Sequence, residues 1–151
     1  MRERHQPITV PPSGAATVSL DYRVPFFDTD AMGIVHHANY VRYLELSRVE
    51  FLRVHDKPYQ EYVAQGFHVA VIRVETHYHR SLRFDDVVRI TCWLDWVKGV
   101  SLGFRYALHC DDQLVLSAAT DHAVVDLQGR PTPMPKERRE VYRRLLSSGA
   151  P

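Results

Sequence analysis

The chain has 151 residues, of which 45% are hydrophobic and 25% charged, and its formal net charge is +1 at pH 7. This length and composition are typical of one globular domain with a single core. The near-zero net charge argues against a nucleic-acid surface, which needs a strong basic field. No apolar run approaches the roughly 20 residues of a membrane span. The charged start of the chain leads into no hydrophobic segment, so we predict a cytoplasmic protein without a secretory signal.

Two cysteines, Cys92 and Cys110, fall within apolar alternating runs. A free cysteine packs like a small hydrophobic side chain, and a disulfide would be unusual in a cytosolic chain. We therefore expect both to be buried, reduced thiols.

The first half of the chain changes from no pattern to a strand and then to a helix. Residues 1–16 lack periodicity and contain several prolines, which predicts a flexible tail before one domain over residues 17–147. Alternation from Thr17 to Phe26 predicts a strand. From about Ala38 to Val54, apolar residues recur at helical spacing and predict a helix packed by one face. The stripe comprises Tyr40, Tyr43, Leu44, Phe51 and Leu52.

The second half of the chain is dominated by strands. A short helical or irregular piece follows Pro58 and ends near Gly66. Strands are then expected over residues 69–78, 88–96, 102–110 and 114–127, before a basic helix over residues 136–146. One long helix followed by a run of antiparallel strands predicts an α+β fold. In the second of these strands, alternation predicts a single core face made of Val88, Ile90, Cys92, Leu94 and Trp96.

The linker over residues 27–40, between the first strand and the long helix, holds the candidate chemistry. It contains Asp28, Asp30, Gly33, His36 and His37. The linker brings an acid to a helix start, where free backbone N–H groups can hold a developing oxyanion. Asp30 could attack a carbonyl or activate water, with donors near His37, and Gly33 would permit an unusual turn. The alternative is that both acids only stabilise turns and caps.

The same residues carry a family resemblance. The pattern Asp-x-Asp-x-x-Gly-x-Val-x-His-x-x-Tyr runs from Asp28 to Tyr40, and the segments 43–50, 83–86 and 99–102 add to it. From about Leu20 to about Leu127, the chain resembles the 4-hydroxybenzoyl-CoA thioesterase family. It is most similar to the branch of small bacterial acyl-CoA thioesterases associated with the Tol-Pal cluster. The resemblance implies a hotdog fold, in which an antiparallel sheet wraps around a long central helix.

The resemblance also implies roles for individual residues. Asp30 would be the catalytic acid, as general base or nucleophile, and His37 with its adjoining amide would polarise the thioester carbonyl. Asp28 would be structural, and His36 is not expected to be catalytic. The substrate-binding residues that we predict are Gly33, Arg83, Lys98 and Ser101, with Arg80 also near the CoA nucleotide. Ser81 stands where the family often has proline.

Three further features invite a functional interpretation. Glu45 is a second acid, on the helix, where some hotdog thioesterases place theirs; an ordinary helix-surface glutamate is the alternative. The segment 99–103 matches Gly-x-Ser-x-Gly, but we reject Ser101 as a nucleophile because a strand follows it instead of a helix. Nine histidines are present, yet no spacing typical of a metal site accompanies them, so we expect no metal.

The function that we predict is hydrolysis of an acyl-CoA thioester to a carboxylic acid and free CoA, without a cofactor. The resemblance implies a homo-dimer or homo-tetramer with the site at the subunit interface. Two alternatives stay open, a non-catalytic domain that binds acyl-CoA and a hotdog enoyl-CoA hydratase. The acyl group cannot be read from the sequence.

Overall fold

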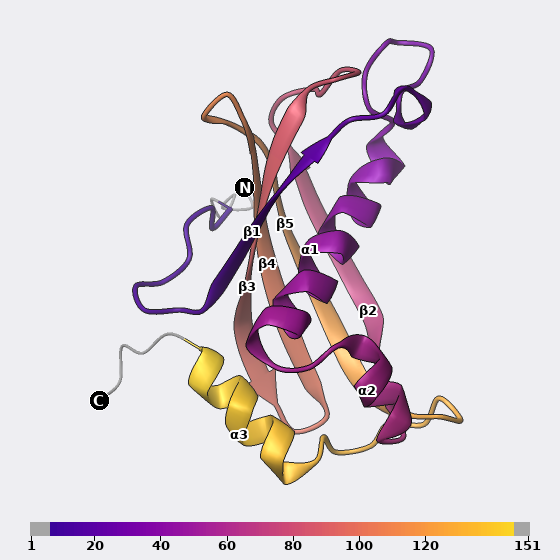
Figure 1. Cartoon of the computed structure of the whole chain (residues 1–151), viewed down its shortest axis with the longest axis vertical. Coiled ribbons are helices and arrows are strands. Elements are labelled where there is room, and N and C mark those ends of the chain that lie inside the picture. The colour runs from indigo at the N-terminus through magenta and orange to yellow at the C-terminus, as the bar shows by residue number, and fades with distance from the viewer. Residues whose placement is uncertain (1–6, 147–151) are drawn as a thin grey trace, which may run out of the picture.

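The computed structural model describes residues 7–146. Its strands form one five-stranded antiparallel sheet in the order β1-β3-β4-β5-β2. The long helix α1 lies across one face of this sheet, and the shorter helices α2 and α3 lie near one end of it (Figure 1). The elements are β1 Thr17–Arg23, α1 Tyr40–His55, α2 Tyr59–Ala64, β2 Phe67–Tyr78, β3 Val87–Lys98, β4 Ser101–Cys110, β5 Gln113–Asp126 and α3 Lys136–Leu145.

The core lies between α1 and the face of the sheet that the helix covers. One side of α1 is buried because its apolar side chains recur every three or four residues. These meet inward-facing side chains of β3, β4 and β5, which alternate along each strand. The α+β class and the wrapped antiparallel sheet are therefore as expected. The buried residues of α1 are Tyr40, Tyr43, Leu44, Ser47, Phe51 and Leu52.

The linker between β1 and α1 is more structured than its sequence suggested. β1 ends at Arg23, three residues before the expected Phe26, and a 3₁₀ turn occupies Phe26–Asp28. A second 3₁₀ turn, His37–Asn39, leads into α1, so the regular helix begins at Tyr40 and not at Ala38. Proline at 25 favours this early strand end, because it removes a ladder donor. Both turns belong to the loop that holds the candidate chemistry.

The expectation that Trp96 shares the core face of β3 is wrong. Leu94 pairs with Phe104, but Trp96 pairs with Gly103, so Asp95 is an extra residue in β3. Such a bulge turns the following side chain to the other face. Trp96 consequently lies over Gly103, where an added Cβ would come within 2.1 Å of its indole nitrogen. Trp93 is fully buried although it lies outside the main core cluster.

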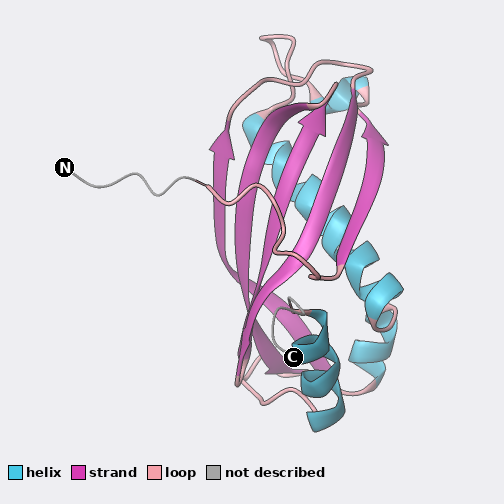
Figure 2. Ribbon diagram, turned by 90° about the vertical axis from the view of Figure 1, so that its left-hand side faces the viewer, coloured by secondary structure: helices cyan, strands magenta, loops and turns pink. Residues whose placement is uncertain are grey.

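The C-terminal helix α3 closes one end of the core. Tyr142 of α3 is buried and its hydroxyl meets that of Tyr62, while Arg138 contacts the Asp56 carboxylate at the end of α1. The Ala16 N–H donates to the carbonyl of Leu145 at 3.3 Å, so the chain just before β1 is tied to this helix. The preceding residues cross the face of the sheet opposite α1 (Figure 2). Residues 1–6 of the expected tail and residue 147 of the expected domain lie outside the described residues.

Two other expectations can be compared with residues 7–146. None of the helices there is both long and apolar enough to cross a membrane. Both cysteines are free thiols; Cys92 is fully buried, whereas Cys110 is only half-buried. Burial raises the pKa of the Cys92 thiol well above its ordinary value, so this sulfur stays protonated.

A buried chain of hydrogen bonds runs beneath α1. The Arg48 guanidinium donates to the Tyr106 hydroxyl at 3.2 Å, and 2.7 Å separates that hydroxyl from the one on Thr120. Thr120 in turn lies 2.8 Å from Nε2 of His122. Arginine can only donate hydrogen bonds, so the Tyr106 hydroxyl donates to Thr120 and the Thr120 hydroxyl donates to His122. His122 therefore accepts at Nε2, as a neutral ring. Burial, with a smaller contribution from the Arg48 charge, lowers the pKa of His122 to about 3.

We predict that His122 makes the fold sensitive to acid. The unfolded chain takes up a proton near the ordinary histidine pKa of 6.5, whereas the folded chain resists it down to about 3. The contribution of His122 to the free energy of unfolding is therefore complete above pH 6.5. It falls as the pH drops towards 3, by at most about 1.4 kcal/mol per pH unit. Chemical denaturation between pH 7 and 4 should show a shallower slope for His122→Gln than for the wild type. Equal slopes would contradict this assignment.

Candidate functional site

Asp28 anchors the loop between β1 and α1. Its side chain is fully buried; the Tyr43 hydroxyl donates to one carboxylate oxygen at 2.6 Å, and the Arg42 guanidinium contacts the other. The Asp28 carbonyl accepts from the His36 N–H at 2.9 Å and from the Asn39 amide at 2.7 Å. Both ends of the loop thus converge on one residue. This geometry is that of a structural acid, as the resemblance implied.

Asp30 forms the next turn, two residues along. Its Oδ1 accepts from the Met32 N–H at 2.8 Å, and its carbonyl accepts from the Gly33 N–H at 2.9 Å. Gly33 has φ +75°, a conformation that side chains disfavour. The hydrogen bond from Met32 within this turn engages one carboxylate oxygen of Asp30. The other, Oδ2, makes no hydrogen bond to residues 7–146 and is free for chemistry.

The start of the helix supplies a donor beside this acid. Nδ1 of His36 accepts from the Ala38 N–H at 3.2 Å, which gives His36 the role of a cap. The Tyr78 hydroxyl donates to the carbonyl of His37 at 2.8 Å. Among the described residues, the backbone N–H of His37 has no hydrogen-bond partner. An unpaired N–H at the start of a helical segment can stabilise an oxyanion.

Asp30 and His37 line the same cavity, of about 320 Å³. Its walls mix an acid, two histidines and an arginine with aromatic and aliphatic side chains, as small-molecule sites do. Tyr78 is a site residue that the sequence pattern did not identify, because it reads only as the end of an alternating strand. The complete lining is Asp30, Met32, Ile34, Val35, His37, Tyr40, Tyr78, His79, Arg80 and Ser81.

A rim with two arginines and two aspartates adjoins this cavity. Arg80 and Ser81 also line a neighbouring hollow of about 360 Å³, together with Arg83. The Arg83 guanidinium lies 3.8 Å from the position that a Cβ on Gly33 would take. The structure therefore brings Arg83 and Gly33 together next to Asp30. Guanidinium groups at such a rim suit phosphate oxygens.

Lys98 and Ser101 lie at the opposite end of the sheet. β3 begins at Val87, close to Arg83, and ends at Lys98, a length of about 36 Å at ~3.3 Å per residue. The Ser101 hydroxyl donates to the Lys98 carbonyl at 3.2 Å, and Ser101 is the first residue of β4. Within one chain, neither residue reaches the Asp30 cavity. The strand that follows Ser101 agrees with rejecting it as a nucleophile.

Glu45 does not share the cavity with Asp30. It is exposed on α1 and lines two other hollows, one towards β1 and one towards β2. The structure thus separates the two candidate acids. Among residues 7–146, no cluster of three or more histidine, cysteine or acidic side chains is placed to hold a metal.

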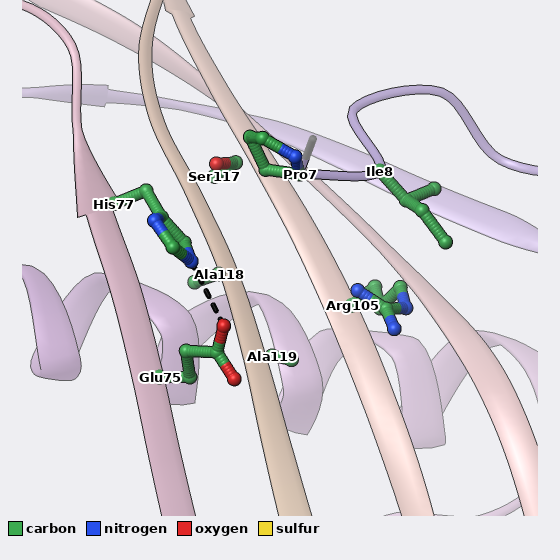
Figure 3. A pocket seen from close by; sticks show the side chains of 8 residues that line it. All are labelled: Pro7, Ile8, Glu75, His77, Arg105, Ser117, Ala118 and Ala119. Carbon is green, nitrogen blue, oxygen red and sulfur yellow. Dashed lines mark hydrogen bonds and ion pairs between the residues drawn. The ribbon is translucent and has the colours of Figure 1, made fainter. Parts of the chain in front are cut away.

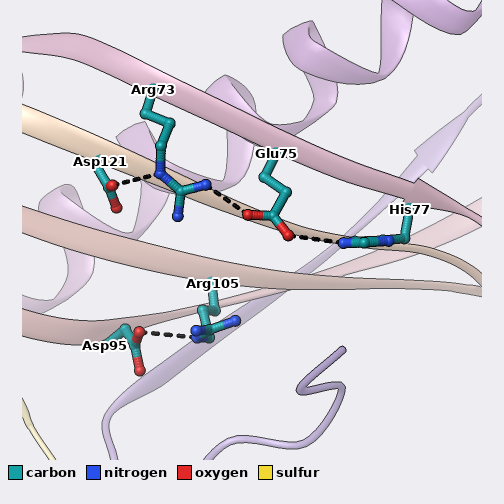
Figure 4. Close-up of polar contacts among 6 residues, drawn as sticks. All are labelled: Arg73, Glu75, His77, Asp95, Arg105 and Asp121. Carbon is teal, nitrogen blue, oxygen red and sulfur yellow. Dashed lines mark hydrogen bonds and ion pairs between the residues drawn. The ribbon is translucent and has the colours of Figure 1, made fainter. Parts of the chain in front are cut away.

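A further cavity, of about 260 Å³, lies on the opposite face of the sheet beneath Pro7 and Ile8 (Figure 3). Its acid, Glu75, accepts from His77 at 2.8 Å and is also paired with Arg73, which reaches Asp121 at 2.7 Å (Figure 4). His77 and then Arg73 lower the pKa of Glu75. A carboxylate held ionised by ion pairs is a poor base, so this cavity lacks the free acid that the Asp30 cavity has.

Three known proteins show what this chain is similar to. The sequence pattern of the thioesterase-like superfamily matches residues 24–144. An acyl-CoA thioester hydrolase of Escherichia coli is 33% identical over 116 residues, which are 76% of this chain and 87% of that protein. An acyl-CoA thioesterase of Haemophilus influenzae is 29% identical over 131 residues, 84% and 95% of the two chains. The crystal structure of a hypothetical Aquifex aeolicus protein has a TM-score of 0.78 at 36% identity, covering 83% of this chain and 98% of that one.

We expect Asp28 to hold the loop and not to act on substrate. Asp28→Asn keeps the shape but weakens the contacts to Arg42 and Tyr43, and we expect about 1–3 kcal/mol of destabilisation. Thermal unfolding measures this loss, and Asp30→Asn, whose carboxylate lacks such buried partners, is the matched control. A larger loss of stability in the Asp30 variant would contradict the assignment.

Proposed function

Because the chain belongs to the thioesterase-like superfamily, we propose that it hydrolyses acyl-CoA thioesters at the cavity shared by Asp30 and His37. One observation carries this proposal: Asp30 and His37 line one cavity at a helix start, and among residues 7–146 one Asp30 carboxylate oxygen and the His37 N–H have no hydrogen-bond partner. An acid and an oxyanion donor are the two things that acyl transfer to water requires. The relatives named as acyl-CoA thioesterases support the choice of substrate.

The reaction needs only the groups at this cavity. Asp30 either takes a proton from water, whose oxygen attacks the carbonyl carbon, or attacks that carbon itself before water releases the acyl group. The His37 N–H polarises the carbonyl and stabilises the tetrahedral oxyanion, while the imidazole orients the substrate. In the general-base route, collapse of the oxyanion breaks the C–S bond and the CoA thiolate takes up the proton held by Asp30. In the nucleophilic route, the C–S bond breaks as the acyl group passes to Asp30, the thiolate takes up a proton from solvent, and water then hydrolyses the acyl group from Asp30. No cofactor is required for either route.

The substrate would span the cavity and the neighbouring hollow. Met32, Ile34 and Tyr40 offer an apolar wall for the acyl group. Arg80 and Arg83, which line that hollow, would meet the phosphates of CoA. Lys98 and Ser101 can join this site only from another subunit. Membership of the 4-hydroxybenzoyl-CoA or Tol-Pal branch, and a cytoplasmic location, stay predictions.

The decisive variant is Asp30→Asn, for which we predict a loss in kcat of about a hundredfold or more, the range for a lost acid or base. The measurement is release of free thiol from a panel of acyl-CoA esters. Only hydrolysis frees the thiol, which separates this function from acyl-CoA binding and from enoyl-CoA hydration. Activity of Asp30→Asn within about threefold of the wild type would exclude Asp30 as the acid. A greater loss in Glu45→Gln, run in parallel, would move the role to Glu45.

We also propose that the active form is a dimer or tetramer. β2 is an edge strand of 12 residues, and it exposes Val71, Ile72 and Val74 by 40–62%. Long apolar edges are protected in native proteins, and pairing two copies about a two-fold axis would extend the sheet. Such pairing would bring the Asp30 loop towards the partner's segment over residues 66–72.

Assembly should therefore be needed for activity. We expect a dimer or tetramer by light scattering at micromolar concentration, because the free β2 edge would be covered. Specific activity should fall upon dilution into any range where the oligomer dissociates. A stable monomer with full turnover per chain would refute the shared site while leaving the thioesterase assignment intact.

A further inference from the structure

The peptide plane that follows His37 is held from both sides. The Tyr78 hydroxyl donates to its oxygen at 2.8 Å, and its N–H, which belongs to Ala38, donates to Nδ1 of His36 at 3.2 Å. The preceding peptide carries the His37 N–H, which has no partner among residues 7–146. The oxygen of that preceding peptide, the His36 carbonyl, accepts from the Asn39 N–H at 2.9 Å, so this plane is held on one side. The bond from Tyr78 holds the next plane, and the two planes together set the direction in which the His37 N–H points.

Tyr78 is itself well placed to act as a fixed support. It is the last residue of β2 and pairs with Leu116 of β5, so its backbone belongs to the sheet. Its ring packs edge-on against Tyr40, with 5.5 Å between centroids and 77° between planes. Tyr40 is buried at the start of α1. The phenol thus links the rigid sheet to the helix start across the cavity.

We expect the Tyr78 hydroxyl to contribute little to the stability of the fold. Its side chain is about half exposed, at 51%, and the loop that it touches is already held by the buried Asp28. A hydroxyl that only secured the loop would duplicate that anchor. Tyr78 instead lines the cavity, and its hydroxyl contacts the residue whose N–H has no partner within the described part of the chain.

We propose that Tyr78 is a positioning residue that aims the His37 N–H at the thioester carbonyl. This inference rests on the proposed thioesterase function and names a residue on which its oxyanion donor depends. The phenol does not itself take or give a proton in the reaction. Its removal should therefore weaken stabilisation of the transition state more than it weakens substrate binding.

The test compares Tyr78→Phe with Thr29→Val. Thr29 lies in the same loop, and its hydroxyl also donates to a carbonyl, that of Phe26 at 2.6 Å, so its loss reports general loosening of the loop. For Tyr78→Phe we expect kcat to fall about threefold to tenfold with KM within about twofold, which is the effect of one neutral hydrogen bond. Thr29→Val should keep both constants within about twofold of the wild type.

A second readout separates positioning from a merely structural role. In an Asp30→Asn background, which retains unhydrolysed substrate, the ¹³C-labelled thioester carbonyl should show an infrared shift to lower frequency upon binding. Adding Tyr78→Phe should reduce that shift, and adding Thr29→Val should not. An unchanged carbonyl shift, or wild-type kcat in Tyr78→Phe, would overturn the inference. Failure of the wild type to release thiol from any acyl-CoA would instead overturn the proposed function on which it rests.

Discussion

The buried carboxylate of Asp28 is the constraint on which the candidate site depends. A charge without solvent must be compensated, and here Arg42 and the Tyr43 hydroxyl on the first turns of α1 compensate it. That requirement holds the loop against the helix. The backbone carbonyl of Asp28 accepts hydrogen bonds from His36 and Asn39, which lie at the far end of the loop. The intervening residues are closed into a compact turn, and Asp30 and His37 line one cavity.

The different roles that we assign to Asp28 and Asp30 follow from their environments. Asp28 has no solvent and several partners, so its oxygens are committed to the fold. Asp30 is only half-buried, and one of its oxygens makes no hydrogen bond to residues 7–146. In the proposed function, residues two apart in one short motif thus have different roles. The first acid holds the loop, and the second would act on the substrate.

The parts of the site that were predictable from sequence are those that lie close together along the chain. Asp30, Gly33 and His37 occupy one loop, and the strand and helix patterns on either side located it. Tyr78 reaches the same cavity from a distant strand, and nothing in its local pattern distinguishes it from the other residues of β2. Lys98 and Ser101 are the opposite case. The family resemblance grouped them with the site residues, but within one chain they lie at the other end of the sheet.

The fold shows the same limit. The order of elements and the α+β class followed from periodicity, since each period has a direct structural cause. The sheet face on which Trp96 lies could not be predicted from periodicity. A single bulge at Asp95 reverses the alternation, and the hydrophobic pattern gives no sign of it. The 3₁₀ turn before α1 likewise depends on contacts from His36 and Asn39 to the Asp28 carbonyl, which a local pattern cannot contain. In this turn the His37 N–H has no hydrogen-bond partner among residues 7–146.

A crystal structure of the Asp30→Asn variant with an unhydrolysed acyl-CoA would test the central claim most directly. We expect the thioester carbonyl oxygen to lie about 2.7–3.1 Å from the His37 nitrogen, the distance typical of an oxyanion donor. We also expect the side chain of residue 30 to face the carbonyl carbon. A thioester bound beside Glu45, away from the start of α1, would contradict it.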